Sequence, residues 1–170
     1  MSFPKFLINY CDLFRRLENL LKSTKGKIVS GGEVDMDDRW ISPTLVVDVP
    51  SDDVLMQEEL FGPILPIVLV SGPMEAVTFI RARGKPLAAY LFSDDKKVRK
   101  LFTELTSSGG VCINDCILHA GVNDLPFGGV GESGLGPKYH GVHSFLTFSN
   151  EKGCVARRIT WWMEWLGRSV

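Results

Sequence analysis

The chain has 170 residues, of which 45% are hydrophobic, and this is enough to build one domain with a buried core. Its 19 lysines and arginines and 20 aspartates and glutamates form no basic or acidic block, so neither nucleic acid nor an anionic membrane is favoured as a partner. The four cysteines contain no C-x-x-C pair, which argues against a zinc site or a disulfide framework and fits a reducing compartment. The first six residues carry no long apolar run, so we expect no secretory signal.

The first part of the chain predicts one helix followed by short strands. Apolar residues at helical spacing predict a helix over roughly residues 10–23. Residues 27–30 (KIVS) predict a strand that two glycines end. Residues 40–49 carry a β-branched run in which Pro43 confines the strand to a sheet edge or to an irregular start. The continuous apolar run PILPIVLV, residues 63–70, predicts a buried strand.

Strands and helices alternate in the next part. A helix is predicted over residues 74–83 after a Ser-Gly-Pro start, and a strand over residues 87–93. A second helix is predicted over residues 94–105, capped by Ser93 with the two aspartates that follow it. Residues 110–114 (GVCIN) predict a further strand. This β-α-β-α-β series predicts an α/β fold with a parallel sheet and flanking helices.

Beyond Asn114 the composition changes. Residues 121–141 are rich in glycine and proline, which predicts a long ordered loop. FLTFSN (145–150) and GCVARRI (153–159) predict two short strands. The Trp-rich tail is shorter than the ~20 residues that span a bilayer, so interfacial contact, a truncated anchor and packing on protein all stay open for it.

Several possible sites can be weighed from residue types. Residues 129–134 match G-x-G-x-x-G but lack the following helix that a dinucleotide fingerprint needs. Cys112 and Cys116 lack the surroundings of a nucleophile, so all four cysteines are interpreted as small core residues. The three histidines are too scattered for a metal site.

Glu58-Glu59-Leu60-Phe61 is the strongest functional signal. A carboxylate can accept hydrogen bonds from both hydroxyls of a ribose, and an aromatic ring can wall off a nicotinamide. Residue types alone favour a blander interpretation, a carboxylate at a helix end beside a core phenylalanine.

Two segments carry a family resemblance: MQEELFGPILPIV (56–68) and LPFGGVGESGLG (125–136) resemble the aldehyde dehydrogenase superfamily. Three further segments are similar to its class 3, fatty-aldehyde-type branch: KPLAAYLFS (85–93), TSSGGVCIND (106–115) and YHG (139–141).

The resemblance implies the C-terminal portion of the family's catalytic domain. The cysteine nucleophile, the glutamate general base and the Gly-rich cofactor turn of the family lie upstream of such a segment, so we expect the chain to be catalytically incomplete. The expected division is an aldehyde dehydrogenase-like part over residues 1–143, oligomerisation strands over 144–159 and the tail over 160–170.

The resemblance also implies roles for single residues. Glu59 would bind the nicotinamide ribose, and Phe61 would pack against the cofactor. Substrate-site candidates are Asn114, which a turn explains equally well, Phe127 in the substrate funnel, and the pair Tyr139 and His140. The segment GLGPKYHG has one residue more than the family usually has before the tyrosine, so the chain departs from the family's pattern directly before that pair.

In a complete family member the implied reaction starts when a cysteine thiolate attacks an aldehyde. The adduct then gives hydride to NAD or NADP, and a glutamate-activated water hydrolyses the thioester. We expect weak or absent cofactor binding by this chain alone. We expect an intracellular location, either in the cytoplasm or at an internal membrane. We also expect the chain to associate with itself or with full-length relatives. The alternative is a non-catalytic truncated form that acts as an oligomerisation module. The sequence does not determine the aldehyde's chain length or the choice between NAD and NADP.

Overall fold

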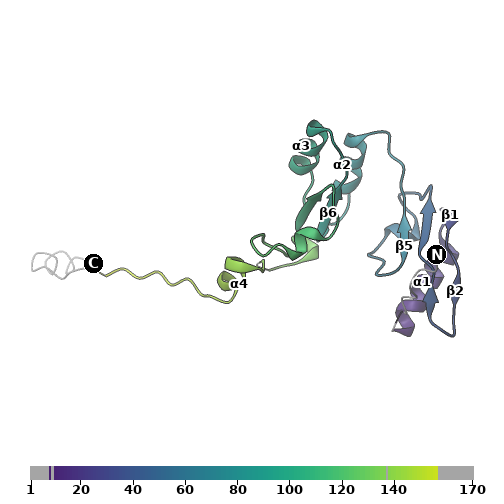
Figure 1. The fold of residues 1–170 in the computed structure, drawn as a ribbon, viewed down its shortest axis with the longest axis horizontal. Helices are drawn as coiled ribbons and strands as arrows, with labels where there is room; N and C mark the ends of the chain where they lie inside the picture. The colour runs from purple at the N-terminus through teal and green to yellow at the C-terminus, as the bar shows by residue number, and fades with distance from the viewer. Residues whose placement is uncertain (1–7, 9, 137, 157–170) are drawn as a thin grey trace, which may run out of the picture. The chain divides into compact units, whose positions relative to one another are not determined.

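A computed structural model describes residue 8 and residues 10–136 and 138–156 of the chain. The chain divides into two compact units, Met1–Glu75 and Ala76–Val170 (Figure 1).

The first unit combines one helix with a three-stranded sheet. The order in the sheet is β1-β4-β5, in which β4 runs antiparallel to β1 and parallel to β5. A small hairpin pairs β2 with β3. The elements are α1 (Cys11–Ser23), β1 (Lys27–Ser30), β2 (Val34–Asp35), β3 (Trp40–Ile41), β4 (Thr44–Val47), the 3-10 helix η1 (Val54–Met56) and β5 (Ile64–Pro66).

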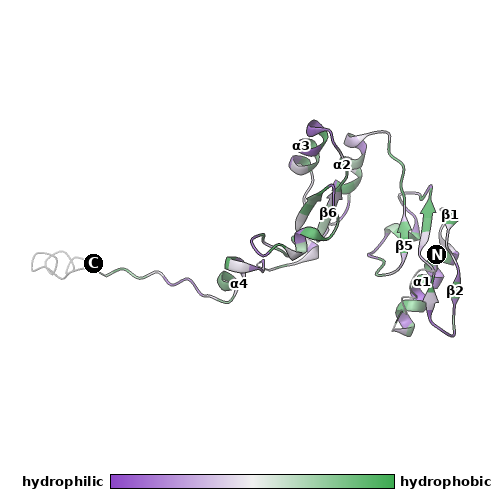
Figure 2. Cartoon of the chain, in the orientation of Figure 1, coloured by the Kyte–Doolittle hydropathy of each residue, from purple (hydrophilic) through white to green (hydrophobic). Residues whose placement is uncertain are grey.

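Helix α1 holds the core of this unit. Phe14, Leu17 and Leu21 are buried and recur at the three- and four-residue spacing of one helix face, which confirms the predicted helix. Burial of each such side chain contributes roughly 1.5–3 kcal/mol. Figure 2 shows both hydrophobic and hydrophilic colours on α1, as the amphipathic pattern requires. The rest of the core cluster comes from the sheet and loops: Ile41, Val46, Val49, Leu55 and Ile64.

The two strand predictions that involve prolines fare differently. Pro43 comes directly before β4, so the irregular start is confirmed, but β4 is the central strand and not an edge. The ring of Pro43 costs no ladder bond there because the strand begins one residue later. The expected buried strand over 63–70 is shorter than predicted. It covers only Ile64–Pro66, and Leu65 and Leu69 are 57% and 74% exposed.

The second unit contains a parallel strand pair with helices. The elements are α2 (Pro73–Arg81), which begins just before the boundary, β6 (Ala88–Leu91), α3 (Lys96–Leu105) and β7 (Gly110–Ile113). β6 and β7 are parallel, with Ala88 opposite Gly110, so the β-α-β part of the predicted series is confirmed. The strand β5 before α2 pairs with β4 instead. Asp95 caps α3, since its side chain accepts a hydrogen bond from the Lys97 backbone N–H at 2.7 Å.

The Gly-rich segment forms an ordered loop, as predicted. It follows the 3-10 helix η2 (Leu118–Gly121) and contains the 3-10 helix η3 (Gly131–Ser133), and its two sides meet at a bridge between Phe127 and Tyr139. The three-residue η3 does not supply the helix that a dinucleotide fingerprint requires.

The expected C-terminal strand FLTFSN is wrong. Its first half lies in a helix, α4 (Gly141–Thr147), its second half carries no strand, and residues 151–156 carry no strand either. A hydrogen bond from the His140 backbone N–H to the Ser144 hydroxyl at 2.8 Å starts this helix, and the pattern of apolar residues fits one helix face as well as a strand. The end of GCVARRI and the Trp-rich tail lie outside the described residues. In the part that the structure describes, no helix combines the length and the apolarity needed to cross a membrane.

Candidate functional site

Arg16 holds the acidic motif of the first unit. Its Nη1 donates to the Glu58 carboxylate at 2.5 Å. Its Nη2 donates to the backbone carbonyl of Leu60 and, more weakly, to that of Glu59 at 3.4 Å. One guanidinium on α1 therefore fixes three consecutive residues of the motif, because its donors are arranged in a rigid plane.

The two residues with implied cofactor roles are both exposed. The Phe61 ring is 71% exposed, so the interpretation of Phe61 as a core residue is wrong. Among the residues that the structure describes, no partner holds the Glu59 carboxylate, whereas its neighbour Glu58 is paired with Arg16. The motif thus exposes an unpaired carboxylate and an aromatic ring to solvent, where a ligand can contact them.

The backbone at Phe61 adopts a conformation that side chains rarely accept. Its φ of +51° lies in the left-handed region, at a cost of about 1–3 kcal/mol for a residue other than glycine. The following Gly62 packs against Leu17, and a Cβ there would lie 2.4 Å from the Leu17 Cδ1. The close approach of α1 therefore fixes the backbone directly after Phe61.

Asp53 anchors the segment that leads into this motif. It is 1% exposed, and it accepts hydrogen bonds from the Lys25 backbone N–H at 2.7 Å, the Leu55 backbone N–H at 2.9 Å and the Thr24 hydroxyl at 2.9 Å. Burial opposes ionisation of the carboxyl group, but these three hydrogen bonds and the Lys25 charge outweigh it and lower the pKa of Asp53. This anchor could not be predicted from the sequence, because its partners Lys25 and Thr24, directly after the first helix, lie 28 and 29 residues away.

Asn114 ties together the carboxyl ends of β6 and β7. Its backbone N–H donates to the Leu91 carbonyl at 2.7 Å, and its side-chain Oδ1 accepts from the Ser93 backbone N–H at 2.8 Å. Its φ of +60° is one that asparagine tolerates. The geometry therefore fits a turn-forming residue, while the exposed side-chain NH₂ group remains a hydrogen-bond donor without a partner among the described residues.

The other three substrate-site candidates lie together in the second unit. Phe127 and Tyr139 exchange two backbone hydrogen bonds of 3.0 and 2.9 Å, and their ring centroids are 5.3 Å apart. The His140 ring lies 4.5 Å from that of Tyr139 and 6.2 Å from that of Phe127. Its Nε2 is 2.9 Å from the Ala120 carbonyl oxygen. The extra residue in this segment has therefore not separated Tyr139 and His140 from Phe127.

Lys138, in the segment that carries the extra residue, holds the loop in place. Its ammonium group donates to the carbonyls of Gly128 and Gly129, the latter at 2.8 Å, and to that of Gly109 at 3.4 Å. A lysine here satisfies three backbone acceptors that the tight packing of glycines leaves close together.

His119 joins the same aromatic cluster and was missed from the sequence. It is 9% exposed, and its ring lies 5.6 Å from Phe127 and 5.7 Å from Tyr90. Within the described residues, neither ring nitrogen has a hydrogen-bond partner. A Cβ on Gly110 would lie 2.9 Å from this ring, so the glycine makes room for it. Only the fold brings these residues together.

The described residues contain no group of histidine, cysteine and carboxylate side chains that could hold a metal ion. All four cysteines are free. Cys112 is half-buried in β7, whereas Cys11, Cys116 and Cys154 are exposed, so the interpretation of those three as core residues is wrong.

A sequence model of the aldehyde dehydrogenase family matches residues 11–153, and the chain belongs to this family. Its relatives include family 3 members at about half identity. Aldehyde dehydrogenase family 3 member A2 of Mus musculus is 52% identical over 85% of this chain and 29% of its own length. The dimeric NADP-preferring aldehyde dehydrogenase of Mus musculus is 50% identical over 86% of this chain and 32% of its own length.

Solved structures of the family share the fold. The substrate-bound state of Staphylococcus aureus AldH has a TM-score of 0.81 and 45% identity, over 91% of this chain and 34% of that one. The chain thus spans about a quarter to a third of the length of the curated relatives that it matches.

Proposed function

We propose that this chain supplies the cofactor-facing and substrate-facing residues of an NAD(P)-dependent aldehyde dehydrogenase that oxidises medium- or long-chain aldehydes inside the cell. The observation that carries the proposal is the exposed Glu59 and Phe61 pair in a chain that matches the family over residues 11–153. The chain would correspond to the C-terminal portion of the enzyme.

The nicotinamide side would be formed by the motif that Arg16 holds. Glu59 has an unpaired carboxylate suited to the two hydroxyls of a ribose, and the exposed Phe61 ring can cover one face of a flat heterocycle. When bound, NAD or NADP would supply the hydride acceptor. The contribution of this chain is to fix the position of that acceptor, since the Arg16 contacts immobilise the backbone on which both side chains sit.

The substrate side would be formed by Phe127, Tyr139, His140 and Asn114. The three rings pack on one another, and their carbon atoms would contact an alkyl chain. The free side-chain NH₂ group of Asn114 is a donor suited to a carbonyl oxygen. We place the cysteine nucleophile and the glutamate base outside this chain, because none of its four cysteines lies in the family's nucleophile motif.

A chimera tests the proposal. Residues 11–153 of this chain would replace the matching segment of the mouse family 3 member A2, and NADH formation would be followed with hexanal and with a long-chain aldehyde. We expect turnover in the chimera. Glu59→Gln in the chimera should lower kcat/KM by about 10- to 100-fold, the effect of losing hydrogen bonds to a charged acceptor.

Glu58→Gln is the matched control. It removes an exposed carboxylate that pairs with Arg16 but leaves the Arg16 bonds to the Glu59 and Leu60 carbonyls, so its effect should stay within about fivefold. Equal effects of the two substitutions would contradict a special role for Glu59. A folded chimera without turnover would contradict the proposal as a whole.

Helix α4 supports a second candidate function, a non-catalytic oligomerisation module. Val142, Phe145 and Leu146 are 63%, 72% and 49% exposed and recur at helical spacing, and Phe148 directly after the helix is 91% exposed. Such an apolar face is typical of a surface that associates with a second copy or with a full-length relative.

A further inference from the structure

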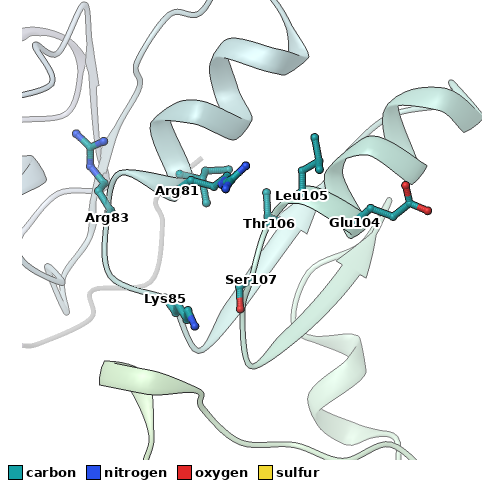
Figure 3. A pocket seen from close by; sticks show the side chains of 8 residues that line it. Arg81, Arg83, Lys85, Glu104, Leu105, Thr106 and Ser107 are labelled. Atoms are coloured by element: carbon teal, nitrogen blue, oxygen red, sulfur yellow. The ribbon is translucent and has the colours of Figure 1, made fainter.

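A cavity of about 390 Å³ opens in the second unit (Figure 3). Its walls come from the end of α2 with the connection to β6, and from the end of α3 with the connection to β7. These connections precede the two parallel strands, whereas Asn114 follows β7. The cavity therefore lies at the opposite end of the strand pair from Asn114.

The walls carry an excess of positive charge. Arg81, Arg83 and Lys85 line the cavity together with a single carboxylate, that of Glu104. Glu104 lies 3.8 Å from the Lys100 ammonium group on the same helix, which offsets its charge. A second carboxylate, that of Glu132, lies close to Gly84, so the three cations outnumber the two nearby carboxylates by one, and the net charge still favours an anion.

Two of the three cations are available to a ligand. The Arg83 guanidinium stacks on the Phe79 ring at 3.5 Å from the centroid and donates to the Phe79 carbonyl at 2.9 Å. Arg81 and Lys85, in contrast, have no partner among the residues that the structure describes.

The remaining walls supply a hydroxyl donor and apolar contacts. Ser107 lines the cavity and its hydroxyl makes no bond to another described residue, while the Thr106 hydroxyl already donates to the Phe102 carbonyl at 2.6 Å. Ile80 and Leu105 offer apolar contact beside these donors.

We propose that this cavity binds the phosphate group of a small phosphate ester, with Arg81, Lys85 and Ser107 as the donors. A phosphate monoester carries close to two negative charges at neutral pH, which match the two unpaired cations, and has three acceptor oxygens. Arginine binds two of these oxygens at once through its planar fork. Ile80 and Leu105 contact the organic part of the ester.

Titration of the full chain tests this site. Phenyl phosphate, inorganic phosphate and succinate would be added at constant ionic strength, and the amide signals of Gly84 and Ser107 followed by NMR. We expect saturable shifts with both phosphates, tighter binding of phenyl phosphate because of its apolar ring, and weaker binding of succinate. Equal binding of succinate, or shifts that do not saturate, would overturn the proposal.

Variants locate the site and separate it from general charge effects. Arg81→Gln and Lys85→Gln should each weaken phenyl phosphate binding by about tenfold, the loss of one charge-assisted contact. Lys96→Gln removes an exposed cation from the other end of α3 and should change binding by less than about twofold. All three side chains are exposed, so the variants should fold, which circular dichroism verifies. Equal weakening by Lys96→Gln would show ionic attraction alone and refute a built site.

Discussion

Replacing Asp53 should loosen the attachment of α1 to the segment that leads into the Glu58–Phe61 motif. The carboxylate accepts from Thr24 and Leu55 through Oδ1 and from the Lys25 backbone N–H through Oδ2. In Asp53→Asn the amide can keep the first two bonds, but its NH₂ group then faces the Lys25 N–H, and two donors cannot pair. We expect a loss of about 2 kcal/mol for Asp53→Asn and about 3–4 kcal/mol for Asp53→Ala, which leaves all three donors unsatisfied.

The same carboxylate makes the stability of this unit depend on pH. Because folding lowers the pKa of Asp53 below its ordinary value of 3.8, the stabilisation is present above that value. It is lost as the pH falls through the lower pKa of the folded state. Asp53→Asn should therefore remove part of the acid sensitivity of this unit.

Hydrogen exchange at the amides of Thr44–Val47 in the full chain reports the local stability of the first unit. The matched control is Asp52→Asn, since Asp52 is exposed and lies 3.8 Å from the Lys25 ammonium group. This control should change the free energy of opening by less than about 1 kcal/mol. Equal effects of the Asp52 and Asp53 substitutions, or exchange that is unchanged in Asp53→Ala, would refute the assignment of Asp53 as the anchor.

Three further predictions concern the isolated chain. It should not oxidise hexanal or a long-chain aldehyde. Turnover near 1 per second or above would be an ordinary enzyme rate. If Cys116→Ala abolished such turnover, a nucleophile would lie in this chain. It should bind NAD weakly or not at all, because one ribose contact and one ring cannot offset the cost of immobilising the cofactor. Micromolar affinity by calorimetry would contradict the proposal that most of the cofactor site lies outside this chain. It should associate with itself, and Phe145→Ser together with Phe148→Ser should shift sedimentation toward the monomer, whereas the exposed polar change Glu151→Gln should not.

The sequence by itself determined the local elements. Helices α1 and α3 follow from apolar residues at helical spacing, and Asp95 caps α3 as the predicted group of three polar residues indicated. Strands β6 and β7 were predicted in place, since short apolar runs between turn residues define them locally. Family motifs likewise directed attention to Glu59 and Phe61. Each of these features depends on residues that are close together in the chain.

Only the tertiary structure decided the features that depend on distant contacts. The exposure of Phe61 follows from Arg16 and Leu17 on α1, more than 40 residues earlier, which hold the backbone on either side of it.

The buried Asp53 and His119 show the same limit. Each is a polar side chain that the sequence would place at the surface, and each is covered by residues far away in the chain. Periodicity and propensity report how a segment prefers to fold by itself. They carry no information about which distant donor, ring or helix will meet it, because that depends on how the whole chain packs.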